Sequence, residues 1–207
     1  MGITSKMIAA RGVRQAEKLG LDAGRIPPSQ YVTARFPVLS YGPNPPYDLA
    51  TWSLAVDGEV EQPFALRWEE LLALPQQEVT VDIHCVTRWS KLDTTWRGVA
   101  VRDLLERARL QPTATHALVH ADGGYTTNLP VEALLDDGVL VAHTYAGEPL
   151  EHDHGAPARL LVPKRYFWKS AKFVRRIEIL PEDRKGFWEL NGYHNDADPW
   201  TEQRHWF

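Results

Sequence analysis

Prolines decide where the first quarter of this chain can form regular structure. A proline ring fixes φ and removes a backbone hydrogen-bond donor, so a proline-rich segment cannot form a continuous helix or a central strand. The first 47 residues hold six of them, at Pro27, Pro28, Pro37, Pro43, Pro45 and Pro46. We therefore expect residues 1–47 to form an extended arm that wraps the rest of the molecule, with one short basic helix over Ala9–Leu19.

The body of the chain, residues 48–180, alternates between two hydrophobic periods. Apolar residues at every second position predict short strands, and apolar residues three or four apart predict short helices. We expect strands over 52–56, 79–85, 117–119, 125–129, 139–145, 159–162 and 173–180. We expect helices over 68–74, 99–110 and 131–135. Because these elements do not alternate strictly, the fold class is α+β and not a doubly wound sheet.

The C-terminal segment, residues 181–207, is aromatic and polar without a clear period. Its GFWELNGYHNDADPW stretch contains Pro199 and turn-forming pairs, so we expect a loop-rich tail packed on the same domain. The large aromatic side chains of this tail must pack somewhere, and one possibility is the mouth of a cleft.

Composition and charge exclude some functions. The chain has 207 residues, of which 43% are apolar and 24% charged, as in an ordinary globular domain. No stretch approaches the roughly 18 apolar residues of a membrane helix. No export signal is visible, so we expect a cytoplasmic protein.

The segment KRYFWKSAKFVRR, residues 164–176, has six basic residues and no acid, which indicates an anion site. A nucleic-acid surface is disfavoured because the net charge is −4.

The chain has a single cysteine, Cys85, which cannot form an internal disulfide. Three interpretations remain open from the residues alone. It is a buried core residue, a nucleophile or a metal ligand. As a nucleophile it lacks a base, because the adjacent His84 should point to the opposite face of a strand. As a zinc ligand it would need His152 and His154, but the paired spacing of a closed zinc site is missing. The last possibility is a metal held mainly by an organic cofactor.

Two motifs in sequence order carry a family resemblance. The stretches CVTRWS, from Cys85, and HDHGAPARLLVPKRYFWKSAKFVRRIEIL, residues 152–180, resemble the molybdopterin-binding domain of the sulfite oxidase family. The resemblance covers roughly 52–180, and the tail is similar to that of small stand-alone bacterial members. It implies an α+β fold with a mixed, barrel-like sheet core and short helices. It also implies that the cofactor is molybdenum bound to molybdopterin.

The resemblance implies roles for particular side chains. Cys85 would be the protein ligand to molybdenum, with Arg88 and Trp89 beside the substrate. Arg159 would make a forked contact to the cofactor phosphate or pterin. The remaining cofactor contacts that we expect come from Arg35, His84, Asp122, His154, Trp168, Lys169, Ser170 and Lys172.

The resemblance also implies a reaction. We expect an oxidoreductase that transfers an oxygen atom on a small S-oxo or N-oxo substrate, in a sulfite oxidase-like or sulfoxide reductase-like direction. The arginines that surround the metal in sulfite-oxidising members have no clear match here, and the Arg-Asn-His element of animal members is replaced by Arg35-Phe36-Pro37. The haem domain of the larger members is also missing, so a separate haem or flavin protein should exchange the electrons. The alternatives are a non-catalytic molybdopterin carrier and a small zinc protein.

Overall fold

The computed structural model describes residue 12 and residues 14–205. Residues 14–19 are helical, which confirms the described part of the helix expected over Ala9–Leu19, and positions 9–11 and 13 lie outside the described residues. In the described chain, no helix combines the length and the apolar character needed to cross a membrane.

One sheet carries the turn that holds Cys85. Its strand order is β1-β5-β8-β10, with β4 paired to β5 and β9 paired to β8. Among the strand pairs described in this sheet, β1 with the start of β5 is parallel and the others are antiparallel. The strands are β1 (Tyr31–Val32), β4 (Gln77–His84), β5 (Trp89–Ala100), β8 (Leu140–Tyr145), β9 (Glu148–Pro149) and β10 (Arg159–Leu161).

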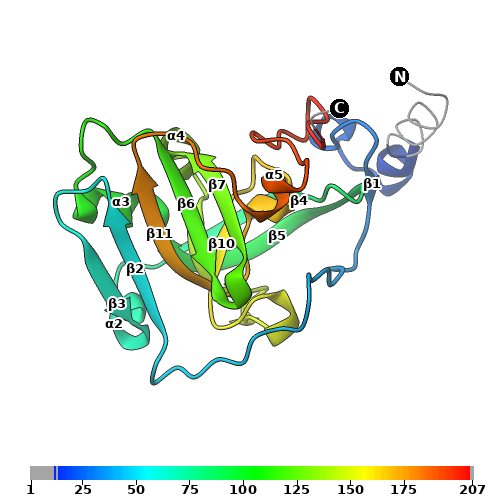
Figure 1. The fold of residues 1–207 in the computed structure, drawn as a ribbon. Coiled ribbons are helices and arrows are strands. Elements are labelled where there is room, and N and C mark those ends of the chain that lie inside the picture. The colour runs from blue at the N-terminus through cyan, green and yellow to red at the C-terminus, as the bar shows by residue number, and fades with distance from the viewer. Residues whose placement is uncertain (1–11, 13, 206–207) are drawn as a thin grey trace.

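A second sheet lies in front of β5 in Figure 1. Its order is β3-β2-β11-β6-β7, with β11 parallel to β2 and antiparallel to β6. The described strands form two open sheets and no closed barrel. The strands of this sheet are β2 (Ser53–Gly58), β3 (Phe64–Arg67), β6 (His116–Ala121), β7 (Thr126–Pro130) and β11 (Val174–Leu180).

Short helices lie between the strands, which confirms the α+β class. The α-helices with assigned bounds are α2 (Trp68–Ala73), α3 (Val101–Ala108), α4 (Val131–Leu134) and α5 (Phe187–Leu190). The 3-10 helices are η1 (Ala23–Arg25), η2 (Asp122–Gly124), η3 (His152–His154) and η4 (Phe167–Lys169). The main apolar core packs the second sheet against α3 and α4, and a smaller aromatic core surrounds Ile83, Trp89 and Trp96.

The long strand β5 was not expected, and it corrects the helix expected over 99–110. The strand runs to Ala100, and helix α3 occupies only Val101–Ala108. Two irregularities interrupt the alternating pattern by which β5 could be recognised in the sequence. Asp93 has a positive φ of 53°, and the pairing with β8 shifts at Gly98. A side chain at Gly98 would place its Cβ 2.2 Å from the carbonyl oxygen of Val141, so the strands approach too closely for any other residue.

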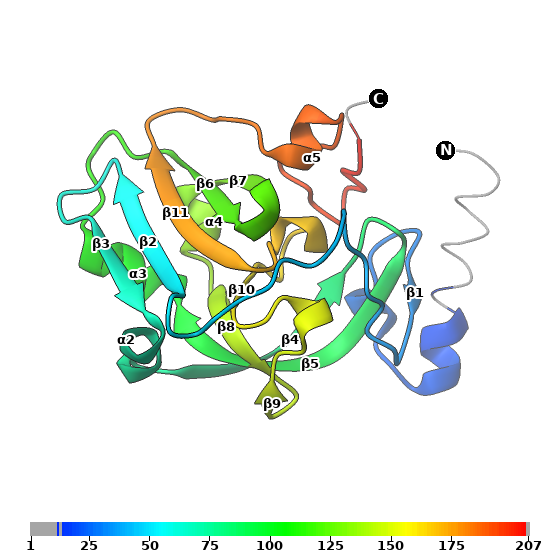
Figure 2. The ribbon, with the colours of Figure 1, turned by 60° about the horizontal axis from the view of Figure 1, so that its bottom comes forward.

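The strap, residues 33–52, connects β1 to β2. In Figure 2 it runs from β1, drawn blue, across the front of β10 to β2, drawn cyan. It has no helix or strand, as its prolines predict, but η1 and β1 show that the arm before it is not entirely irregular. The C-terminal tail starts at the end of β11, and its described part, residues 181–205, crosses the molecule to α5 and ends on the side of β1 in both views (Figures 1 and 2).

Candidate functional site

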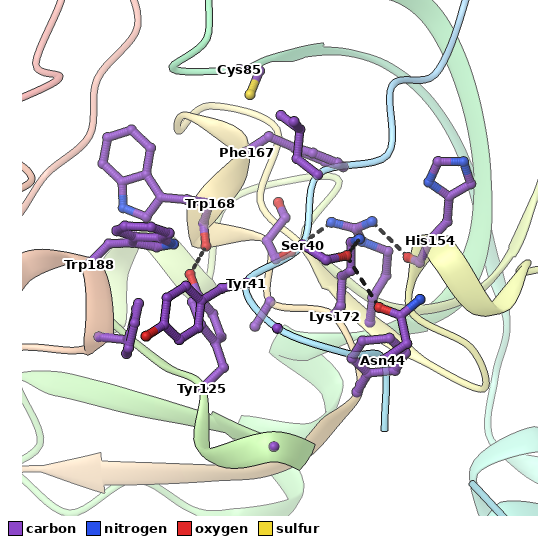
Figure 3. A pocket seen from close by; sticks show the side chains of 18 of the residues that line it. Ser40, Tyr41, Asn44, Cys85, Tyr125, His154, Phe167, Trp168, Lys172 and Trp188 are labelled. Carbon is purple, nitrogen blue, oxygen red and sulfur yellow. Dashed lines mark hydrogen bonds between the residues drawn. The ribbon is translucent and has the colours of Figure 1, made fainter. Parts of the chain in front are cut away.

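A cavity of about 600 Å³ opens between segments that lie far apart in the sequence. The strap closes one side, and the aromatic start of the tail, with Trp188 and Tyr193, closes another. The floor comes from the turn after β4, from η2 and from residues 154–173. Figure 3 shows the strap passing in front of the side chains that point into this space.

The structure brings most of the expected site residues to this cavity. Eight of them line it, namely Cys85, Trp89, Asp122, His154, Arg159, Trp168, Ser170 and Lys172. Four do not line it, namely Arg35, His84, Arg88 and Lys169. The ligand roles of the first eight stay predictions, but their convergence on one space does not depend on the family resemblance.

Cys85 lies directly after β4, where the chain turns toward β5. Its backbone N–H donates to the Trp89 carbonyl over 2.8 Å, and its own carbonyl accepts from the Arg88 N–H over 3.0 Å. The Thr87 hydroxyl donates to Sγ over 3.1 Å. Burial raises the pKa of the thiol above its ordinary value. Cys85 is therefore buried, as the core interpretation requires, yet it also borders a cavity.

The nucleophile interpretation finds no His, Asp or Glu side chain hydrogen-bonded to this thiol in the described part of the chain. The His84 ring makes its 2.8 Å hydrogen bond through Nδ1 to the hydroxyl of Ser90, and no hydrogen bond joins it to Cys85. Burial lowers the pKa of His84 to about 4, so the ring is neutral near pH 7. His84 is a buried, hydrogen-bonded side chain that does not line the cavity, so its expected cofactor contact stays a prediction without support from its position.

The zinc interpretation also lacks its ligands. Among the residues that the structure describes, no three His, Cys, Asp or Glu side chains are grouped to hold a metal ion. The ring of His152 donates to the Pro45 carbonyl over 2.8 Å, in the strap. The ring of His154 instead stacks on Phe36, with a centroid distance of 3.8 Å.

Arg159 is the best fixed cation of the cavity. It lies on β10 with 1% of its surface exposed. Its guanidinium donates to the carbonyls of His154 over 2.8 Å and Ser170 over 2.7 Å, and it covers the ring of Phe167 at 4.2 Å. Burial lowers its pKa to about 9. These contacts hold the planar guanidinium in one orientation at the cavity wall.

Lys172 joins this wall to the strap. Its ammonium donates to the Asp153 carbonyl over 2.6 Å and to the Ser40 hydroxyl over 3.0 Å. Burial, and then the charge of Arg159, lower its pKa to about 8. The ring of His154 also has a lowered pKa because it is partly buried and faces both cations. Cations are thus concentrated where the sequence predicts an anion site.

Lys169 does not line the cavity, and its ammonium is paired with a carboxylate of the tail. Its ammonium is 2.6 Å from the carboxylate of Glu189, and both side chains are fully buried. Glu189 also accepts from the indole N–H of Trp168 over 2.9 Å. The motif lysine that seemed to be a cofactor contact therefore anchors the tail, and Trp168 reaches the cavity beside it.

The other expected residues have separate environments. Asp122 lines the cavity but pairs with Arg175 over 2.6 Å. The hydroxyl of Ser170 accepts from the Val162 N–H over 2.9 Å. Arg35 is exposed on the strap, and Arg88 is half-buried behind the Cys85 turn.

Sequence reasoning missed several cavity residues. Ser40, Tyr41 and Asn44 come from the strap, where prolines indicated only irregular structure. Tyr125 lines the cavity and donates to the Trp168 carbonyl over 2.6 Å. The aromatic content of the tail was the one signal for Trp188, because large aromatic side chains need a surface to pack on.

Known proteins resemble this chain in sequence and in fold. It is 47% identical over 183 residues to the uncharacterized oxidoreductase YuiH of Bacillus subtilis, covering 88% of this chain and 92% of that protein. It is 27% identical over 184 residues to the protein-methionine-sulfoxide reductase catalytic subunit MsrP of Campylobacter jejuni, covering 77% of this chain and 61% of that protein.

The fold is similar to that of a solved structure, the sulfane dehydrogenase SoxCD from Paracoccus pantotrophus. The TM-score is 0.63 at 23% identity, covering 76% of this chain and 46% of that chain. The chain therefore spans only part of the MsrP and SoxCD chains that it matches.

A family model gives the assignment. The model of the oxidoreductase molybdopterin binding domain matches residues 41–188, from the strap to the aromatic start of the tail. This range contains Cys85, His154, Arg159 and Lys172. The chain belongs to the oxidoreductase molybdopterin binding domain family, whose cofactor is molybdenum bound to molybdopterin.

Proposed function

We propose that this protein uses the cofactor of its family to transfer an oxygen atom to or from a small S-oxo or N-oxo substrate, and that a sulfoxide-type substrate fits best. The observation that carries the proposal is the position of the lone thiol. Cys85 borders the same cavity as Arg159, His154 and Lys172, although these residues come from distant parts of the sequence.

The chemistry of the cavity fits the cofactor. A thiolate is a soft ligand and suits a metal that is already bound by sulfur. The cavity volume of about 600 Å³ lies within the range of cofactor sites. Two buried nitrogen atoms at its wall, His154 Nδ1 and Trp89 Nε1, have no hydrogen-bond partner in the described protein. Such buried polar atoms favour a bound group that supplies partners.

Each part of the wall has a task in this proposal. Arg159 and Lys172 would hold the cofactor phosphate, because cations fixed by carbonyl contacts lose little freedom on binding an anion. His154 and the backbone of residues 170–172 would contact the pterin. When bound, the cofactor supplies the two-electron chemistry of oxygen-atom transfer. The surrounding aromatic side chains exclude water from the Cys85 side of the cavity.

The substrate side of the cavity is aromatic and uncharged. Trp188 and Tyr193 of the tail line it, together with Val86 and Thr87 beside the thiol. Burial, and then the nearby Cys85, raise the pKa of Tyr193, so its phenol keeps its proton near pH 7 and can donate a hydrogen bond. Arg88 and Arg204 do not line the cavity, and none of the side chains named here carries a cation to pair with an anion such as sulfite, so this lining favours a neutral oxo compound. The resemblance to the methionine-sulfoxide reductase subunit supports the same substrate class.

Turnover requires an electron partner. Oxygen-atom transfer moves two electrons, and we infer that a separate haem or flavin protein exchanges them with this chain.

The test combines metal analysis with turnover. Protein expressed with added molybdate should contain stoichiometric molybdenum and pterin, and should oxidise a reduced dye when methionine sulfoxide is added. Sulfite with an oxidised dye is the opposing assay, and faster sulfite turnover would contradict the sulfoxide assignment. Folded protein without molybdenum would overturn the whole proposal. Full molybdenum loading with no turnover of any oxo substrate would favour a cofactor carrier.

A further inference from the structure

Arg204 reaches from the C-terminal tail to the turn that holds Cys85. Only 9% of its surface is exposed. One of its terminal nitrogens donates to the carbonyl of Val86, the residue directly after Cys85. The guanidinium lies 4.7 Å above the ring of Tyr166, whose own N–H donates to the tail. Arg204 is outside the matched range 41–188, so the family assignment gives it no role.

The charge of Arg204 is only partly compensated within the described protein, by the carboxylate of Glu202. Its Nε and its second terminal nitrogen are buried without a hydrogen-bond partner. The carboxylate of Glu202 is 3.8 Å from Nε, which is too long for a hydrogen bond. Arg88 adds a second positive charge nearby, and its NH1 is also buried without a partner. Burial is the main cause that lowers the pKa of Arg204, and Arg88 acts in the same direction.

A buried cation needs a negative partner, because the protein interior solvates charge poorly. Cys85 favours the charged form of Arg204 only when the sulfur is a thiolate. As a thiol, Cys85 carries no charge. As a ligand thiolate joined to an anionic cofactor, it would add its negative charge to that of Glu202 beside the two guanidinium groups.

We propose that Arg204 is a positioning residue, which fixes the turn that holds Cys85 and supplies positive charge behind the sulfur when it binds the cofactor. The inference rests on the proposed function. It places the C-terminal tail in the environment of the metal. It also predicts that the tail changes the midpoint potential and the affinity of the metal, in addition to closing the cavity. Residues behind a ligand commonly change metal affinity and potential in this way.

A purely structural role can be separated from an electrostatic one. The R204K variant keeps the charge and loses the forked geometry, whereas R204Q keeps a donor for the Val86 carbonyl and loses the charge. An electrostatic role predicts a lower midpoint potential of the metal in R204Q. A nearby cation stabilises the reduced centre, which is more negative, more than the oxidised centre, so removing the cation makes reduction less favourable. It also predicts faster cofactor loss in R204Q, on the order of tenfold. R204K should stay close to the wild type in both measurements.

The experiment uses molybdenum-loaded full-length protein, with R102Q as the control, since Arg102 is a half-exposed arginine on α3. Redox titration gives the midpoint potential, and molybdenum retained after dialysis gives cofactor loss. Equal behaviour of R204K and R204Q, or an unchanged potential in R204Q, would overturn the inference. If R204Q does not fold, R88Q provides the second variant, and it should lower the potential in the same direction. Wild-type protein that contains no molybdenum would refute the proposed function. Molybdenum-loaded wild type whose R204Q variant has the same midpoint potential and the same molybdenum retention would refute this inference alone.

Discussion

The ammonium of Lys169 and the carboxylate of Glu189 form a fully buried ion pair across 2.6 Å, and this pair joins the C-terminal tail to the domain. Lys169 also donates to the backbone and side-chain oxygens of Asn128, each over 2.7 Å. Glu189 is in α5, directly after Trp188, which lines the cavity. The pair therefore fixes one aromatic wall of the site from behind.

Replacing Glu189 by glutamine should destabilise the protein strongly. The change leaves Lys169 charged and buried without its anion, and loss of one partner of a buried pair costs about 3–5 kcal/mol of unfolding free energy. Denaturant unfolding of the cofactor-free protein measures this. The matched control is D136N, which breaks the pair with Lys164 on the surface and should cost less than about 1 kcal/mol. Similar losses of unfolding free energy in both variants would show that the buried ion pair stabilises the protein no more than the surface pair does.

Gly155 should tolerate alanine poorly, for two separable reasons. Its φ is +107°, and an added Cβ would lie 2.9 Å from the Cβ of Lys172. Gly147 has a φ of +85° and open space around the same position, so G147A reports the backbone strain alone. We expect G147A to cost about 1 kcal/mol and G155A about 2–4 kcal/mol of unfolding free energy, because the clash adds to the strain.

The same comparison tests the cationic wall. In G155A the side chain of Lys172 must move away from its contacts with Asp153 and Ser40, so cofactor retention should fall in G155A and not in G147A. If G155A and G147A have equal unfolding free energies and retain the cofactor equally, Lys172 can move aside without an energetic penalty. Gly155 would then not be needed to hold Lys172 in place.

Sequence periodicity predicted the strands that build the site, because their alternation is regular. Val79, Val81 and Ile83 alternate through β4, and Cys85 follows at the end of that strand as expected. In β5 the alternation is broken by a positive φ at Asp93 and by the shifted pairing near Gly98, so the longest strand was missed. Local pattern cannot show an irregularity that only the partner strand stabilises.

The motif predicted which segment forms the cationic wall, but not which of its lysines faces the cavity. Lys169 and Lys172 are equivalent in sequence context, and only the carboxylate of Glu189, from the tail, shows that Lys169 points away. The strap is a similar case. Its prolines exclude regular structure, whereas its place over the cavity depends on long-range contacts such as that of Asn44 with Asp153 over 2.7 Å.

Replacing Cys85 by serine should weaken molybdenum binding without unfolding the protein. Serine has nearly the same volume, so we expect a change in unfolding free energy within about 2 kcal/mol. A hydroxyl is a poor substitute for a soft thiolate, so bound molybdenum should fall below that of the wild type. The control is T87V, which removes only the 3.1 Å hydrogen bond to Sγ and should keep the metal. Full molybdenum content in C85S would show that the thiol is a packing residue.

Cofactor retention and protein stability should respond to alkaline pH in opposite directions because of Lys172. Its pKa is lowered to about 8 by burial and by Arg159, from an ordinary value of 10.5. Above pH 8 the folded chain therefore loses this proton while the unfolded chain still holds it. The unfolded state then binds more protons, so the unfolding free energy of the cofactor-free protein should rise between about pH 8 and pH 10.5.

Over the same range the cofactor-loaded protein should lose its cofactor faster, because a neutral amine no longer attracts a phosphate. K172Q should remove the Lys172 contribution to both pH dependences, while K164Q, which removes a largely exposed charge, should keep them. Dialysis at pH 7 and pH 9.5 followed by molybdenum analysis measures the first effect, and denaturant unfolding at the same pH values measures the second. If wild type and K172Q lose molybdenum at the same rates at both pH values, Lys172 holds the strap alone and makes no contact with the cofactor.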